Sequence, residues 1–400
     1  MEKQKRYAII DIEATTFQKG SPYSARNKLC CIGISTNGIS HCLDIEYSGR
    51  PYAAAIRTIK GILDQVDIIV GFNLKYDLGW LKRYGIRLDP GRHSIWDCQL
   101  AEFVLDNQSR AYPSLADSLS KYMLPAKSDV VAHEYWEQGL DTLQVPWDIL
   151  SSYNITDLEV TDALYQKQLQ LVPDSKRSLL KLQNQDLLVL LDMEFNGIRF
   201  DTGAMAKEAE HVQASMLQVE AELQGFIDHW PRFNWDSGDH LSSLLYGGTV
   251  SVDVATPYEA VAKSGELKGQ TVVRNRWETV SKIFPRLVEP LDGSELKKST
   301  EGAGYWSVEE STLRQLRADK KTKRLIELLL TRSELEKYLS TYLIGIPAHA
   351  IKYDWQDGFI HGTFNQCRVV TGRLSSEKPN QQNFPKEIDQ FIVSRFTPSA

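Results

Sequence analysis

The sequence predicts an α/β fold, in which a mixed β-sheet covered by helices is followed by a mainly helical region. Two observations support this prediction. Over the first 172 residues, short apolar strand-like runs alternate with helical stretches, which is typical of a sheet with helices packed on it. After Pro173 the chain changes to long amphipathic helices, with apolar residues at spacings of three, four and seven.

Composition sets broad limits on the class of protein. A chain of 400 residues can hold two or three domains, and 42% hydrophobic with 24% charged residues is ordinary for a globular protein. A net charge of −6 neither indicates nor excludes a nucleic-acid partner, because such binding depends on local basic surface. There is no apolar N-terminal signal and no run of about eighteen apolar residues, so we expect a cytoplasmic protein without a membrane partner. The cysteines are odd in number and lack metal-ligand spacing, which indicates free thiols: Cys30, Cys31, Cys42, Cys98 and Cys367.

The first predicted strand, YAII at residues 7–10, leads directly into Asp11 and Glu13. Residues two apart on an extended chain point to the same side, so the two carboxylates should project together. Two like charges this close favour a hard divalent cation between them. The alternative is a strand end that turns into solvent with two hydrated acids, and the motif alone leaves both interpretations open.

The next elements continue the α/β pattern. Strands are predicted at 31–35 and 41–47, joined at the hairpin signal Asn37-Gly38. A helix over 53–66, a strand over 67–73 and a helix around 78–85 follow. Asn73 and Asp77 lie where this last strand passes into its helix, at the sheet edge where open α/β folds carry their sites. The alternative is that Asn73 caps the helix and Asp77 is an acid of its first turn.

Three later stretches complete the first 172 residues. Asp97 precedes a helical run and is interpreted as an N-cap. Residues 125–147 contain prolines, glycine and scattered charges, and we expect a mobile connection there. The helix over 147–171 carries Tyr153 and Asp157 four residues apart, which places both on one face.

Taken together, the motifs DxE (Asp11, Glu13), NxxxD (Asp77) and YxxxD (Tyr153, Asp157) resemble the tyrosine variant of the DEDD superfamily of 3′→5′ exonucleases. The resemblance implies a ribonuclease H-like domain over 1–172 that hydrolyses phosphodiesters with two divalent cations, Mg²⁺ or Mn²⁺. It implies that Asp11 bridges both ions, that Glu13 and Asp157 complete the first site, and that Asp77 holds the second.

The same resemblance assigns other roles near this site. Tyr153, with Glu13, would orient the attacking water, since a phenol with a pKa near 10 is a poor general base. Phe17 would wedge against the base at the 3′ end, or it belongs to the core. Asn73 would contact the DNA strand.

Downstream, the segments 233–246, 304–316 and 325–343, and above all TGRLSS (371–376) with PNQQNFP (379–385), resemble family A, polymerase I-like DNA polymerases of phage type. This implies a thumb-like helical region over 173–350 and the first strands of a palm over 351–400. Residues expected by this resemblance to contact the primer–template duplex are Arg373, Ser375, Ser376, Asn380, Gln382 and Asn383. Arginine and amide side chains suit the minor groove, where pair geometry matters more than sequence.

Two features of this region leave alternatives. The polar segment near 247–304 is longer than a minimal thumb tip requires, and it is either a site for a processivity factor or a tolerated insertion. The basic run over 317–324 would grip phosphates or form a solvated helix face. The sequence ends at IVSRFTPSA, before the first catalytic palm aspartate expected from the resemblance, so the chain alone is not expected to polymerise.

The sequence therefore predicts a metal-dependent 3′→5′ exonuclease that proofreads during DNA replication, as part of a family A polymerase in a bacterial or phage-infected cytoplasm. Two alternatives stay open. One is a DNA-binding assembly subunit that completes a split polymerase with a second polypeptide. The other is an exoribonuclease with the same acidic residues. The sequence leaves open the physiological metal, the oligomeric state, the identity of any processivity factor, and whether the chain is a fragment or half of a split enzyme.

Overall fold

The computed structural model describes residues 5–89, 91–261, 264, 270–298 and 304–393. The chain divides into two compact units, residues 1–204 with 345–400, and residues 205–344. Parts of two predicted segments lie outside the described residues: 262–263, 265–269 and 299–303 of the polar segment, and 394–400 of the palm segment. Within the part that is described, no helix combines the length and apolar character needed to cross a membrane.

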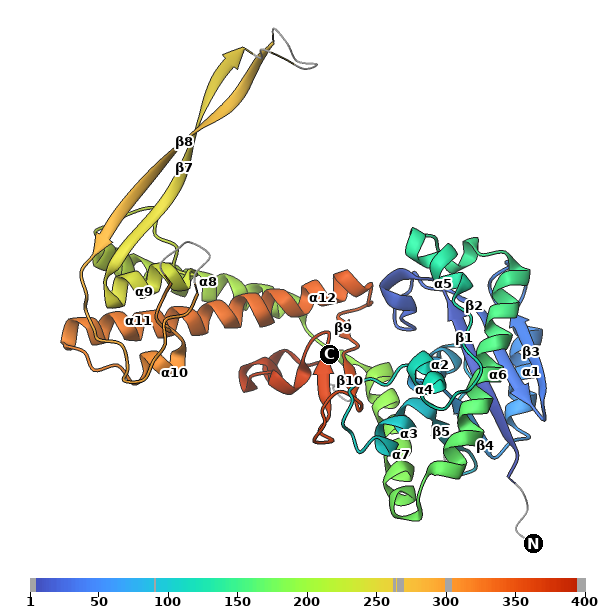
Figure 1. Cartoon of the computed structure of the whole chain (residues 1–400). Helices are drawn as coiled ribbons and strands as arrows, with labels where there is room; N and C mark the ends of the chain where they lie inside the picture. The colour runs from blue at the N-terminus through green and yellow to red at the C-terminus, as the bar shows by residue number, and fades with distance from the viewer. Residues whose placement is uncertain (1–4, 90, 262–263, 265–269, 299–303, 394–400) are drawn as a thin grey trace, which may run out of the picture. The chain divides into compact units, whose positions relative to one another are not determined.

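The first unit is built on a five-stranded mixed sheet with the order β3-β2-β1-β4-β5 (Figure 1). The antiparallel strands are β1 (Tyr7–Ala14), β2 (Leu29–Thr36) and β3 (Ile39–Asp44), while β4 (Ile68–Gly71) and β5 (Ser94–Asp97) run parallel to β1. The predicted α/β class is confirmed. The first strand runs four residues beyond the predicted Ile10, so both acids of the DxE motif lie within it.

Helices cover both faces of this sheet (Figure 1). They are α1 (Ala53–Leu63), α2 (Leu74–Arg83), α3 (Cys98–Leu105), α4 (Leu115–Lys121), α5 (Val130–Glu134), α6 (Trp147–Leu171) and α7 (Asp174–Asn196). The two faces of β1 enter different cores, because side chains alternate along a strand. Ile10 joins the core that contains Trp80 of α2, whereas Ile9 joins the core that contains Leu158 of α6. Asp11 and Glu13 follow Ile9 at spacings of two, so they face α6.

Local signals account for several element ends. Asp97 caps α3 by accepting from the backbone N–H groups of Gln99 at 2.8 Å and Leu100 at 3.1 Å, as predicted. Its second oxygen accepts from Leu74 N at 2.7 Å, which fixes the start of α2 as well. Gly197, with a φ of 63°, directly follows α7 and ends it, since glycine adopts this left-handed conformation without steric cost.

The C-terminal part of the chain returns to the first unit. It contains α12 (Gly345–Tyr353), β9 (Phe359–Ile360), β10 (Thr363–Asn365) and β11 (Ser375–Glu377), and β9 pairs with β6 (Ile198–Arg199). Strands β10 and β11 form an antiparallel pair. The TGRLSS motif therefore ends in β11, and the PNQQNFP motif follows it.

The second unit is helical, as predicted, apart from one long hairpin. Its helices are α8 (Thr202–Gln224), α9 (Gly238–Tyr246), α10 (Glu310–Leu313) and α11 (Lys320–Lys337), the last continuing as a π-helix over Tyr338–Ile344. Leu223, Leu245 and Leu329 meet in its core. Strands β7 (Gly248–Val261) and β8 (Thr271–Phe284) pair over 14 residues each and project from the helices of this unit (Figure 1).

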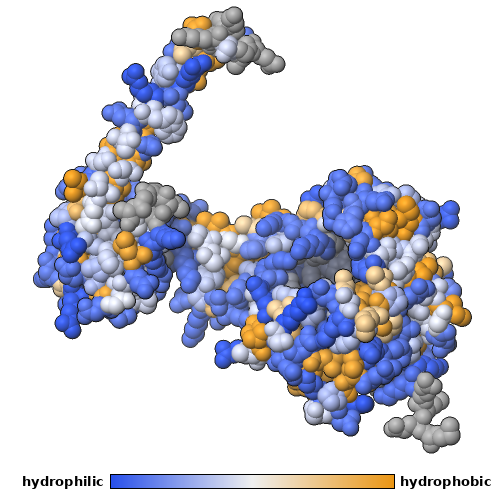
Figure 2. Space-filling view, viewed as in Figure 1, coloured by the Kyte–Doolittle hydropathy of each residue, from blue (hydrophilic) through white to orange (hydrophobic). Residues whose placement is uncertain are grey.

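The polar segment predicted near 247–304 is thus largely a two-stranded ribbon. Only its base is buried, through Val250 and Phe284, which join the helical core. Figure 2 shows mainly hydrophilic residues along the visible face of this hairpin, with hydrophobic residues interspersed.

Candidate metal centre

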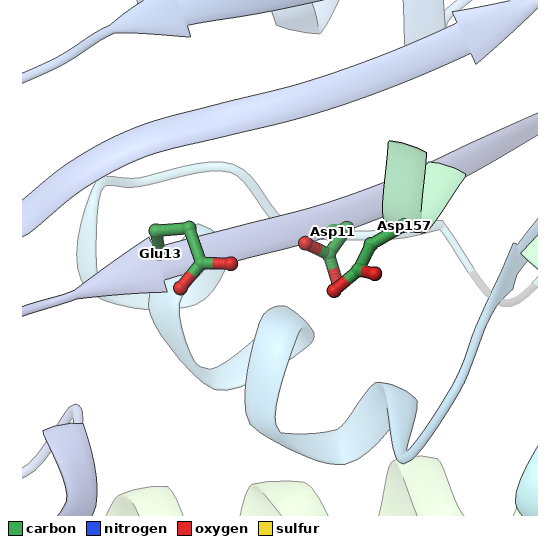
Figure 3. A group of neighbouring side chains, drawn as sticks. All are labelled: Asp11, Glu13 and Asp157. Carbon is green, nitrogen blue, oxygen red and sulfur yellow. The ribbon is translucent and has the colours of Figure 1, made fainter. Parts of the chain in front are cut away.

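The acids of β1 meet an acid of α6. Ligand oxygens of Asp11, Glu13 and Asp157 all lie within 4.8 Å of one another. Figure 3 shows Asp11 and Glu13 projecting from the same side of the strand, with Asp157 reaching them from the helix. The period-2 geometry of β1 and the position of α6 on this face of the sheet together create the cluster.

A glycine allows α6 to approach the sheet. Gly33 of β2 has no Cβ, and a Cβ built there would lie 2.2 Å from Oδ1 of Asn154. Asn154 uses this space to donate from Nδ2 to Oδ2 of Asp11 at 2.8 Å, which orients the Asp11 carboxylate. Asn154 was not singled out from the sequence, although its position three residues before Asp157 places it on the same helix face.

Burial and mutual repulsion raise the pKa values of these acids. Burial, followed by the charge of Asp157, raises the pKa of Asp11 to about 7. Burial raises the pKa of Glu13 well above its ordinary range, and the charges of Asp11 and Asp157 add to this effect. A cation placed among these carboxylates would relieve both the repulsion and the loss of hydration.

Asp77 lies next to this cluster but is not one of the three acids that meet. It is buried in the first turn of α2, 4% exposed, and burial followed by the charge of Asp11 raises its pKa. Three of the four predicted carboxylates therefore have oxygens within 4.8 Å of one another. The fourth, Asp77, is close enough for the charge of Asp11 to raise its pKa.

Tyr153 and a lysine complete the surroundings. Tyr153 is 3% exposed, and burial followed by the charge of Glu13 raises its pKa above the ordinary value, so the phenol stays protonated. Lys127 donates from Nζ to Oδ2 of Asp157 at 2.8 Å and lies 4.9 Å from the centre of the Tyr153 ring. Burial lowers the pKa of Lys127, but Asp157 and Tyr153 raise it by more. No sequence signal identified this lysine, which lies in the loop between α4 and α5.

The donor set fits a hard divalent cation. Oδ1 of Asp157 and Oδ1 of Asn154 are buried and have no hydrogen-bond partner among the described residues. A buried carboxylate oxygen without a donor is costly, and carboxylate oxygens are the ligands that Mg²⁺ and Mn²⁺ prefer.

The predicted DNA-contact residues of the first 172 positions lie near α2 and the turn after β1. Phe17 is half-buried beneath the guanidinium of Arg26, 4.1 Å from the ring centre, and it is not a member of the main core. Asn73 is exposed at the start of α2 with a φ of 57°. It borders a cavity of about 590 Å³, which Lys19 and Lys75 also line.

The predicted DNA-contact residues of the palm segment form a separate turn. Ser376 is buried and accepts from Gln381 N at 3.2 Å, while Asn380 accepts from Gln382 N at 3.1 Å. Gln382 in turn donates to Leu374 O at 3.4 Å. The others are Arg373, which is exposed, Ser375, which is half-buried, and Asn383.

Comparison with known proteins assigns the family. Residues 3–172 match the family model described as 3′-5′ exonuclease, and residues 280–399 match the model described as DNA polymerase family A. The chain belongs to the family A DNA polymerases. It combines an N-terminal 3′–5′ exonuclease domain with part of the polymerase domain, as the sequence motifs predicted.

Relatives of this family A chain are longer. It is 26% identical over 324 residues to the DNA polymerase I of a Synechocystis strain, covering 79% of this chain and 27% of that protein. It is 23% identical over 416 residues to the DNA polymerase of Bacillus phage SP01, covering 94% of this chain and 42% of that protein. The chain thus spans less than half the length of either relative.

A solved structure supports the fold. The polymerase domain of Pol1 from M. smegmatis, in complex with a DNA primer-template and dNTP, superposes with a TM-score of 0.64 and 18% identity. The match covers 98% of this chain and 56% of that one.

Proposed function

We propose that this chain hydrolyses DNA from the 3′ end, as the proofreading part of a family A DNA polymerase. The observation that carries the proposal is the meeting of Asp11, Glu13 and Asp157 inside the region that matches the exonuclease family model. Asp77, buried beside them, completes the four acids that the motifs predict.

Two divalent cations of the Mg²⁺ or Mn²⁺ type, when bound, activate water and stabilise the leaving oxygen. The residues that would hold them are Asp11, Glu13 and Asp157 for the first ion, and Asp11 with Asp77 for the second. Oδ1 of Asp157, which lacks a hydrogen-bond partner among the described residues, is suited to this use.

The role of Tyr153 follows from its pKa. Because burial keeps its phenol protonated, the hydroxyl can donate to or orient a water but cannot remove a proton near neutral pH. We expect Tyr153→Phe to slow the chemical step in single-turnover assays and to leave metal affinity nearly unchanged. An unchanged single-turnover rate would remove Tyr153 from the reaction.

The strand that enters the site would pass Phe17 and Asn73. Both lie at the start of elements next to the acids, and Asn73 borders the cavity that Lys19 lines. The turn that contains Arg373 and the serines would contact the primer–template duplex. The β7–β8 hairpin is the part of the chain available to a processivity factor.

The test is degradation of a 5′-labelled single-stranded DNA oligonucleotide with Mg²⁺ or Mn²⁺, compared with EDTA. We expect a ladder that shortens from the 3′ end, and a loss of about 10³-fold in Asp11→Ala and Asp157→Ala, because several kcal/mol of stabilisation disappear. Glu159→Ala is the matched control, since this exposed acid lies two residues from Asp157 on α6.

DNA binding by the two inactive variants should persist. Activity in either variant at the level of Glu159→Ala would remove the metal assignment. An RNA oligonucleotide of the same sequence, assayed in parallel, tests the alternative of an exoribonuclease, which predicts faster degradation of RNA than of DNA.

A further inference from the structure

One cation of this chain lies inside the acidic site, and the motifs do not account for it. Lys127 comes from the loop between α4 and α5, and its side chain is 25% exposed. Its ammonium contacts two different groups of the proposed reaction. The distance from Nζ to Oδ2 of Asp157 is 2.8 Å, and the distance to the centre of the Tyr153 ring is 4.9 Å.

The two oxygens of Asp157 have different environments. Oδ2 accepts from Lys127, whereas Oδ1 is buried without a hydrogen-bond partner among the described residues. The lysine thus fixes the rotation of the carboxylate and leaves one oxygen free to bind a ligand. Because ammonium groups donate only, Lys127 cannot itself coordinate a cation.

Asp157 and Tyr153 lie one helical turn apart on α6, and Lys127 touches both. A single group can therefore hold a metal ligand and a water-orienting phenol in one fixed relation. Partners of this kind, which orient the groups that touch the metal, typically change metal affinity by about 10–100-fold when removed.

We propose that Lys127 is a positioning residue of the exonuclease centre, holding the Asp157 carboxylate and the Tyr153 ring in the arrangement that cation binding and hydrolysis require. The proposal rests on the proposed exonuclease function. The opposite role is a lysine that occupies the position of the cation and must be displaced by it. The two roles predict opposite changes in metal affinity.

The first measurement is isothermal titration calorimetry, in which the full chain is titrated with Mn²⁺ in the absence of DNA. We expect Lys127→Met to weaken Mn²⁺ binding by about 10–100-fold. Lys127→Arg, which keeps a cationic donor, should restore most of the affinity. Lys121→Met is the matched control, because Lys121 also pairs with a buried acid, Glu102, and belongs to α4 outside the cluster.

The second measurement is steady-state hydrolysis at saturating Mn²⁺. Lys127→Met should lower kcat while leaving KM for the oligonucleotide within about threefold, since the lysine acts on groups that take part in the chemistry. Tighter or unchanged Mn²⁺ binding in Lys127→Met would overturn the proposal, and so would a loss of affinity that Lys121→Met reproduces.

Failure of the two proposals can be told apart. If the wild-type chain binds Mn²⁺ but does not cleave DNA, the proposed function fails while the titration still reports whether Lys127 positions the ligand. If the wild-type chain cleaves DNA and Lys127→Met has wild-type affinity and kcat, only the role of Lys127 fails.

Discussion

Replacing Glu194 with alanine should destabilise the junction between α2, α7 and β10. Glu194 is almost fully buried, with a side chain that is 4% exposed, and it pairs with Lys75, which is 16% exposed. Its Oε1 accepts from Lys75 Nζ at 2.5 Å and from Phe364 N at 2.6 Å. Its Oε2 accepts from the Tyr23 hydroxyl at 3.4 Å. One carboxylate therefore satisfies a charge on α2, a backbone donor on β10 and a phenol.

The expected magnitude follows from these contacts. Removing one partner of a buried ion pair costs about 3–5 kcal/mol. The lower end applies here, because Lys75 keeps a hydrogen bond to the Phe364 carbonyl and some solvent contact. The loss of the acceptor for Phe364 N adds about 1 kcal/mol. The sum is about 4 kcal/mol, which corresponds to about a 10³-fold change in an opening equilibrium.

Native-state hydrogen exchange followed by mass spectrometry is the suitable assay, because a chain with two compact units need not unfold in one step. Peptides covering α2 and β10 should exchange about 10³-fold faster in Glu194→Ala. Asp174→Ala, on the same helix, is the control, since Asp174 is 95% exposed and should cost less than about 1 kcal/mol.

A double variant sharpens this test. Replacing Lys75 with methionine and Glu194 with leucine removes both charges. Phe364 N and the Tyr23 hydroxyl then lose their acceptor, and the Phe364 carbonyl loses its donor, so about 1–3 kcal/mol of the loss should remain. The reasoning is refuted if Glu194→Ala accelerates exchange by less than tenfold, or if the double variant is less stable than Glu194→Ala.

Three further predictions concern the metal centre and the helical unit. Mn²⁺ affinity should fall as the pH is lowered through about 7, because Asp11, whose pKa is raised to about 7, then holds a proton that the cation must displace; a flat profile from calorimetry would contradict this. Gly33→Ala should lower the free energy of unfolding by about 1–3 kcal/mol and weaken Mn²⁺ binding, because the added methyl group displaces Asn154. In the control Gly61→Ala the added Cβ meets open space, so stability should be unchanged or increased. Equal melting temperatures for the two variants would show that the close approach of Asn154 to Gly33 is unimportant. Arg332→Met should destabilise residues 205–344 by about 2 kcal/mol. This 10% exposed guanidinium pairs with Glu220 and Asp236, which are 26% and 65% exposed and can regain water. The measurement is hydrogen exchange in α11, and a change below about 0.5 kcal/mol would contradict the prediction.

The sequence predicted those parts of the site that depend on local periodicity. Asp11 and Glu13 share a face because a strand has a period of two, and Tyr153 and Asp157 share a helix face because they are four residues apart. The apolar run of β1 also predicted a buried strand. The structure retains these shared faces because they depend only on local backbone geometry and not on contacts between distant residues.

The hairpin of β7 and β8 shows the opposite case. Its strands are stabilised by pairing with each other over 14 residues, and beyond the base most of their side chains are exposed. Strand prediction relies on an apolar face that alternates with a polar one, and a ribbon with two exposed faces lacks this contrast. The segment was therefore predicted only as polar and glycine-containing.

The connection over 125–147 makes tertiary contacts that no local sequence pattern encodes. Oδ2 of Asp141 accepts from Thr16 N at 2.8 Å and from the Thr16 hydroxyl at 2.9 Å, just beyond the end of β1. At its other end, Lys127 holds Asp157 on α6. Because β1 and α6 supply all three clustered acids, this connection touches both sources of the metal ligands. Substitutions along it should therefore change metal affinity more than the free energy of unfolding, which is the reverse of what a passive linker would show.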